Sequence, residues 1–196
     1  MKLLFVSLFF SVSLWRQQKI SLKTQSGDSI TVVKEIIYYN NKPISKTIEK
    51  DIVYNSKYNR LIEQGGTILL FLEMDGRPDY NYLEAFRITK QKATDLVACV
   101  YNDNHQRHGP APFTDMDNDG KLEFGGFDLT EGYAAEDSMY YCPSKYYEIS
   151  HGNIVFDSAL TKKMDLKENG IYLPKPLDKD GNCCVVIKKP GNTNSR

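Results

Sequence analysis

The side chains best suited to bind a ligand are concentrated between residues 115 and 123. Carboxylates occupy positions 1, 3, 5 and 9 of this run: Asp115, Asp117, Asp119 and Glu123. Calcium takes about six to eight oxygen ligands in a flexible arrangement, and a tight loop can direct alternate carboxylates at one point. Gly120 permits the sharp turn after position 5, and the carbonyl of Lys121 at position 7 adds an oxygen. The spacing predicts a metal site built from all five of these oxygen donors.

The chemistry of the donors indicates which metal this is. Oxygen-only ligands favour calcium or magnesium over zinc or copper, and flexible carboxylates with a carbonyl favour Ca²⁺ of the two. Crowded carboxylates repel one another unless a cation neutralises them. The alternative is a solvated acidic turn without an ion. A shorter acidic segment, residues 178–182, is interpreted as a plain turn.

This loop resembles the β-hairpin calcium loops of FG-GAP and VCBS-type repeats, over about residues 93–129. A helical EF-hand would need an acid at its twelfth position, where this chain has Gly126. The resemblance implies an extracellular β module in which a strand, the loop and a second strand follow one another and calcium rigidifies the loop. The chain departs from the family pattern in having Glu123 where Asp is more usual, no Gly-Ala-Pro after the loop and no second full copy.

Two other groups of residues offer weaker chemistry. His105 and His108 have the spacing of a metal-ligand pair, and a secreted hydrolase could combine them with an acid nearby: Asp128, Glu131 or Asp137. Neither a nucleophile elbow nor an H-E-x-x-H motif is present, and a polar surface loop is the simpler interpretation. A set of tyrosines could form a sugar- or protein-binding platform, or could pack in cross-strand pairs: Tyr133, Tyr140, Tyr141, Tyr146 and Tyr147.

The elements that must position these residues are predicted to be strands. Short runs rich in β-branched and aromatic residues are bounded by turn residues. The strands are expected at residues 30–39, 44–52, 67–72, 80–88, 96–101, 139–149, 154–156 and 183–187, with a hairpin turn at Asn40-Asn41. Short helices are expected at 51–64 and at 160–169, the second stopped by Gly170. The fold class is therefore all-β, with antiparallel sheets in a propeller-like meander or a sandwich and at most one or two short helices.

Composition and charge exclude some classes of function. The chain has 196 residues, 41% of them hydrophobic, which is enough for a sizeable core. Lys and Arg number 25 and Asp and Glu also number 25, so the net charge is zero. A nucleic-acid partner that is bound through a basic surface is not expected. The first apolar run is too short for a membrane span.

The N-terminal segment predicts export. Residues 1–13 have a positive start, an apolar run and small residues at Ser11 and Ser13, which is typical of a signal peptide; a buried N-terminal element is the alternative. A single β-rich domain is expected over 14–189 and a disordered tail over 190–196. In an oxidising compartment a disulfide is expected from the adjacent Cys183 and Cys184 to Cys99 or Cys142, with the pairing left open.

Taken together, the sequence predicts a secreted or periplasmic protein. Its predicted role is a non-enzymatic binding or structural module, in which Ca²⁺ braces a β-hairpin loop. The partner would be a protein or a glycan of unknown identity. The rival hypothesis is the secreted hydrolase that would use His105 and His108.

Overall fold

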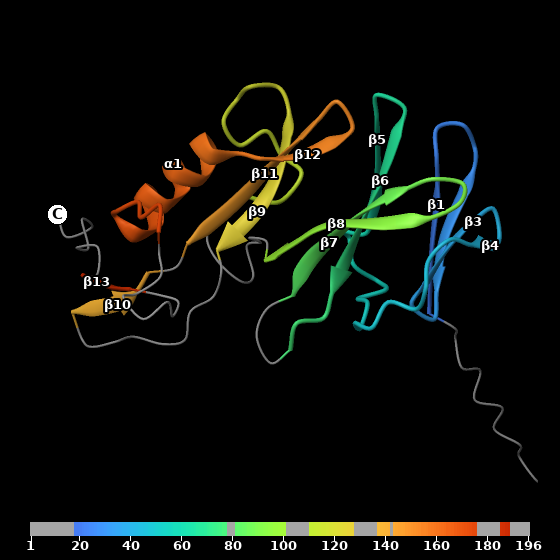
Figure 1. The fold of residues 1–196 in the computed structure, drawn as a ribbon, viewed down its shortest axis with the longest axis horizontal. Helices are drawn as coiled ribbons and strands as arrows, with labels where there is room; N and C mark the ends of the chain where they lie inside the picture. Colours follow the sequence, from blue (N-terminus) through green and yellow to red (C-terminus); the bar gives the residue numbers. More distant parts are fainter. Residues whose placement is uncertain are drawn as a thin grey trace, which may run out of the picture.

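The residues that the structure describes form antiparallel sheets with one short helix, which confirms the predicted fold class (Figure 1). The structure is a computed structural model. It describes residues 18–77, 81–100, 110–127, 137–141, 143–175 and 185–188. Three larger sheets are stacked in layers, the helix covers the outer face of the third, and two further strands form a small fourth sheet.

The first sheet is a meander whose strands pair in chain order. Its members are β1 (Lys19–Lys23), β2 (Ser29–Val33), β3 (Ile36–Tyr39) and β4 (Lys42–Pro43). The single strand predicted over 30–39 is wrong, because Lys34 and Glu35 have φ angles of 50° and 59° and form a tight turn between β2 and β3. The hairpin at Asn40-Asn41 is confirmed, with φ angles of 45° and 67°. The strand predicted over 44–52 is absent apart from one bridge at Ile52.

The second sheet is another meander in chain order. It contains β5 (Arg60–Gln64), β6 (Thr67–Met74), β7 (Tyr82–Ile88) and β8 (Ala93–Val100). The helix predicted over 51–64 is wrong. Gly65 and Gly66, with φ angles of 57° and 75°, form a hairpin turn that pairs residues 60–64 with residues 67–71. Backbone hydrogen bonds across this hairpin override the helical spacing of the apolar residues.

Both faces of the second sheet are covered, which accounts for the nearly continuous apolar sequence of β6. One face packs on the first sheet through Leu70, Leu72, Met74, Phe86 and Ile88. The opposite face packs on the third sheet through Leu69, Phe71, Leu83 and Ala85. The second sheet is therefore the central layer that joins the other two.

The third sheet carries the acidic loop and the helix. Its strand order is β12 (Asn153–Phe156), β11 (Ser144–Ser150), β9 (Leu122–Phe127). The helix α1 (Ser158–Asn169) packs on β11 through Leu160, Met164 and Tyr146. Asp157 caps its first turn by accepting a hydrogen bond from the N–H of Leu160.

The C-terminal cap of α1 confirms the predicted helix, because Gly170 adopts a φ of 71° and its N–H donates to the Leu166 carbonyl. The predicted strand 139–149 is instead two strands, β11 and β10 (Ser138–Tyr140), and β10 pairs with β13 (Val186–Lys188).

Several sequence predictions lie outside the described residues. These are the signal peptide at 1–13, the tail at 190–196, and the side chains of the four cysteines Cys99, Cys142, Cys183 and Cys184. Among the described residues, no helix combines the length and the apolar character that crossing a bilayer requires.

Candidate metal centre

The acidic loop leads into β9 and is closed at its base by the backbone. Thr114 and Glu123 form an antiparallel bridge, in which the Glu123 N–H donates to the Thr114 carbonyl at 2.9 Å. The N–H of Phe113 donates to the Glu123 carbonyl at 2.7 Å. The ring of Phe113 packs edge-on against Phe71 of the central sheet, with 4.8 Å between the ring centroids. The loop therefore begins and ends on the core between the second and third sheets.

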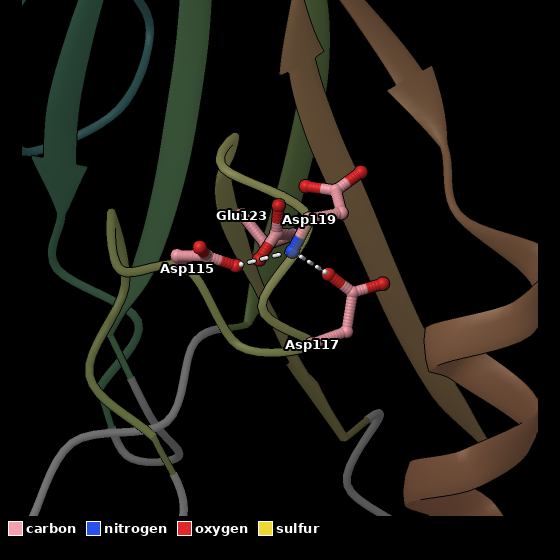
Figure 2. A group of neighbouring side chains, drawn as sticks. All are labelled: Asp115, Asp117, Asp119 and Glu123. Carbon is pink, nitrogen blue, oxygen red and sulfur yellow. Dashed lines mark hydrogen bonds between the residues drawn. The ribbon is translucent and has the colours of Figure 1, made fainter.

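Inside the loop, backbone N–H groups hold the first carboxylate in place, and Figure 2 shows the contact from the N–H of Asp119. One oxygen of Asp115 accepts from Asn118 at 2.7 Å and from Asp119 at 3.0 Å, and the other accepts from Gly120 at 3.0 Å. The N–H of Asp119 also lies 3.2 Å from an oxygen of Asp117. Gly120 has a φ of 87°, which gives the left-handed turn that its sequence position predicted.

The turn brings the four predicted side-chain ligands together. Asp115, Asp117, Asp119 and Glu123 each contribute one carboxylate oxygen, and these oxygens all lie within 4.8 Å of one another. Calcium–oxygen bonds of about 2.3–2.6 Å allow two ligands of one ion to be up to about 5 Å apart. The four oxygens therefore fit around a single ion of this size, and the cluster could hold a metal.

Glu123 differs from the three aspartates because it is buried. Its exposed fraction is 1%, whereas Asp115 and Asp119 are exposed. One oxygen, Oε2, accepts from the N–H of Met116 at 2.6 Å, and the other, Oε1, has no hydrogen-bond partner. Burial raises the pKa of this carboxyl to about 7, and the negative charges of the three aspartates add to the shift.

Two side chains that the sequence did not predict as part of the site, those of Lys121 and Glu148, lie next to the cluster. The ammonium of Lys121 lies 2.7 Å from Asp119 Oδ2 and 2.9 Å from Glu148 Oε2. Glu148 belongs to β11 and pairs directly with Glu123 of β9, so the two side chains share a face of the third sheet. The hydrogen bond from Lys121 lowers the pKa of Asp119, and the hydrogen bonds to Asp119 and then Glu148 raise the pKa of Lys121. Only the alternation along β9 and β11 could have indicated this contact.

The structure leaves the other predicted site residues untested or places them outside the cluster. The role of the Lys121 carbonyl as a ligand stays a prediction. For the hydrolase hypothesis, His105, His108, Asp128 and Glu131 lie outside the described residues, and Asp137 is an exposed residue directly before β10.

The tyrosine platform is wrong for the tyrosines that the structure places in the core. Tyr141 and Tyr146 are fully buried. Tyr147 stacks on Phe124, with 5.6 Å between the ring centroids. Packing is therefore the role of these three side chains, and Tyr133 lies outside the described residues.

The site as a whole is a set of oxygen donors with one buried member, Glu123, whose Oε1 has no hydrogen-bond partner. All four clustered side chains offer oxygen, and none offers nitrogen or sulfur, so the set suits a hard cation. Comparison with models of known protein families, with curated proteins and with solved structures finds no match to this chain.

Proposed function

We propose that the loop at residues 115–123 binds one Ca²⁺ ion, which braces the start of β9 in a non-enzymatic binding or structural module. The carboxylates of Asp115, Asp117, Asp119 and Glu123 would be ligands, with the Lys121 carbonyl as a fifth donor. The resemblance to the calcium loops of FG-GAP and VCBS-type repeats stays an expectation. The strands β8 and β9 on either side of the loop belong to different sheets, so the Thr114–Glu123 bridge, and not a pairing of β8 with β9, closes the loop.

The observation that carries the proposal is the free oxygen of Glu123. A buried carboxylate oxygen without a hydrogen-bond donor from the protein is costly, because no protein group replaces its lost hydration. Three aspartate oxygens lie within 4.8 Å of the Glu123 ligand oxygen, so like charges raise this cost further. A divalent cation bound among these oxygens would remove both penalties.

The expected role of the ion is mechanical. The loop ends at Phe113 and Glu123, and Phe113 packs with Phe71 and Phe124 in the core between the second and third sheets. The guanidinium of Arg60 covers the ring of Phe113 at 4.4 Å. An ion that fixes the loop would therefore also fix the packing of the third sheet against the central one.

The predicted export of the chain agrees with this role. Calcium sites of extracellular modules bind at about 10⁻⁴–10⁻³ M, and we propose an affinity in that range for this loop. The partner of the module would be a protein or a glycan outside the cytoplasm.

Thermal unfolding with EDTA, calcium and magnesium tests the site. An ion about a hundredfold above its Kd stabilises the folded chain by about 2.7 kcal/mol, which for a protein of this size is about 5–10 °C in Tm. We expect calcium to raise Tm by this amount. Asp117→Ala should abolish the rise because it removes a ligand.

Asp137→Ala is the matched control, since it removes an exposed aspartate outside the cluster. It should keep the full calcium response. No calcium-dependent rise in the unsubstituted chain, or an unchanged rise in Asp117→Ala, would mean that the acidic segment is a turn without an ion.

A further inference from the structure

The side chain of Lys121 lies between the candidate ligand Asp119 and Glu148, an acid outside the cluster. Its ammonium donates to Asp119 Oδ2 at 2.7 Å and to Glu148 Oε2 at 2.9 Å. Both oxygens of Asp119 are then engaged, because Oδ1 accepts from the backbone N–H of Lys121 at 2.9 Å. In the described hydrogen bonds, Asp115 and Asp117 accept from backbone N–H groups alone. Among the described contacts of these three aspartates, it is therefore Asp119 whose carboxylate is paired with a positively charged side chain, that of Lys121.

The position of Glu148 gives this ammonium a second site. Glu148 pairs with Glu123 across β9 and β11, so it stands beside the cluster on the same face. Its side chain is 18% exposed, against 35% for Asp119. Water screens the more enclosed Glu148 carboxylate less, so this acid alone can hold the ammonium, although the contact with Asp119 is the shorter of the two. Lys121 can therefore release Asp119 and keep its contact with Glu148.

We propose that Lys121 is an internal competitor for the metal site: its ammonium must leave Asp119 before a divalent cation can bind there, and Glu148 then holds it. This inference rests on the proposed function, because it concerns the affinity of the same loop. Lys121 and Glu148 would set the affinity of the loop for Ca²⁺ and favour a divalent over a monovalent cation. Neither side chain is proposed as a ligand.

Lys121 contacts only one of the four carboxylates, which explains why a divalent ion would still displace its ammonium from Asp119. The ammonium contacts Asp119 at the rim of the loop, while the buried Oε1 of Glu123 has no hydrogen-bond partner. A lysine tethered at position 121 thus neutralises one ligand. An ion among all four oxygens would neutralise the whole cluster, Glu123 included.

Calorimetric titration with calcium tests the proposal. Lys121→Met keeps the aliphatic stem and removes the charge, so calcium should bind about two- to fivefold more tightly. Lys163→Met makes the same change of charge at an exposed position of α1, and its Kd should equal that of the unsubstituted chain. An affinity of Lys121→Met no higher than that of Lys163→Met would overturn the inference.

A calcium-bound structure of the unsubstituted chain tests the movement directly and does not depend on any variant folding. The contact from Lys121 to Glu148 should remain, and the contact to Asp119 should be lost. Retention of the Lys121–Asp119 contact beside a bound ion would overturn the inference while the proposed function stands. If neither the unsubstituted chain nor Lys121→Met binds calcium, the proposed function fails, and the inference falls with it.

Discussion

Replacing Gly152 by alanine is expected to destabilise the protein by about 2–5 kcal/mol. Gly152 lies in the turn between β11 and β12 with a φ of 73°, where a side chain is strained by itself. A Cβ at this position would lie 2.4 Å from the Gln64 carbonyl oxygen and 2.6 Å from Thr67 Cβ. Gln64 and Thr67 flank the turn of the β5–β6 hairpin. The substitution would therefore push apart two hairpins of neighbouring sheets.

Gly66→Ala is the matched control for this effect. Gly66 has a φ of 75°, nearly that of Gly152, but an added Cβ would meet nothing within 4 Å. Its substitution should cost only the left-handed strain, about 1–2 kcal/mol. Urea unfolding of both variants separates the cost of the close contacts at Gly152 from the cost of the left-handed backbone that both positions share. Equal losses of unfolding free energy would show that the two hairpins do not pack as closely as described.

The close contact of these hairpins could not be predicted from the sequence. The turn at Gly152 follows from the dipeptide His151-Gly152, and the turn at Gly65-Gly66 follows from its composition. Their meeting, with Gly152 N–H donating to the side chain of Gln64 at 3.0 Å, joins residues 88 positions apart. Local turn chemistry gives no information about such a distant pair.

Strand prediction succeeded where the apolar runs were continuous and failed where spacing was ambiguous. The run at 67–72 became the core of β6, because its alternate residues face two different sheets. At 51–64 the apolar residues also fit a helical period, and only the pairing of β5 with β6 decides between the two structures. The turn at Lys34-Glu35 has no Gly, Asn or Asp, so its residue types gave no signal.

The candidate site was predictable as far as it is local. Four acids within nine residues and a glycine define the loop, and the structure brings all four carboxylates together. Spacing could not show that Glu123 is buried, because its burial depends on the packing around the third sheet. Glu148 was missed for a similar reason: it reaches the site by strand pairing and not by sequence proximity.

The burial of Glu123 leads to the second large effect, which is expected for Glu123→Gln. This variant should lose the calcium-dependent rise in Tm, because calcium needs the anionic carboxylate. Without the ion, at pH 8, it should be more stable than the unsubstituted chain by about 1–3 kcal/mol. The amide oxygen can still accept from Met116 N–H, while the amide nitrogen can donate to the aspartates.

The pH dependence of the unfolding free energy without calcium shows whether the stabilisation by Glu123→Gln comes from removing a buried charge or from a general change in packing. Burial raises the pKa of Glu123 from 4.5 to about 7 in the folded chain, so the folded state binds a proton that the unfolded state has released between these values. The unfolding free energy in EDTA should therefore fall as pH rises from about 4.5 to about 7, and level off above that. Glu123→Gln has no such group and should remove this fall.

Urea unfolding between pH 4.5 and 8, in EDTA and in calcium, measures both effects on the same variants. Glu49→Gln serves as the control, since Glu49 is exposed and should keep the slope of the unsubstituted chain. Calcium should flatten the slope of the unsubstituted chain, because the ion replaces the proton on Glu123 and stabilises the folded state most where the carboxylate is ionised. The unfolding free energy in EDTA would contradict this explanation if its change between pH 5 and 7 were the same in Glu123→Gln as in the unsubstituted chain. Glu123 would then not be a buried carboxyl with a raised pKa.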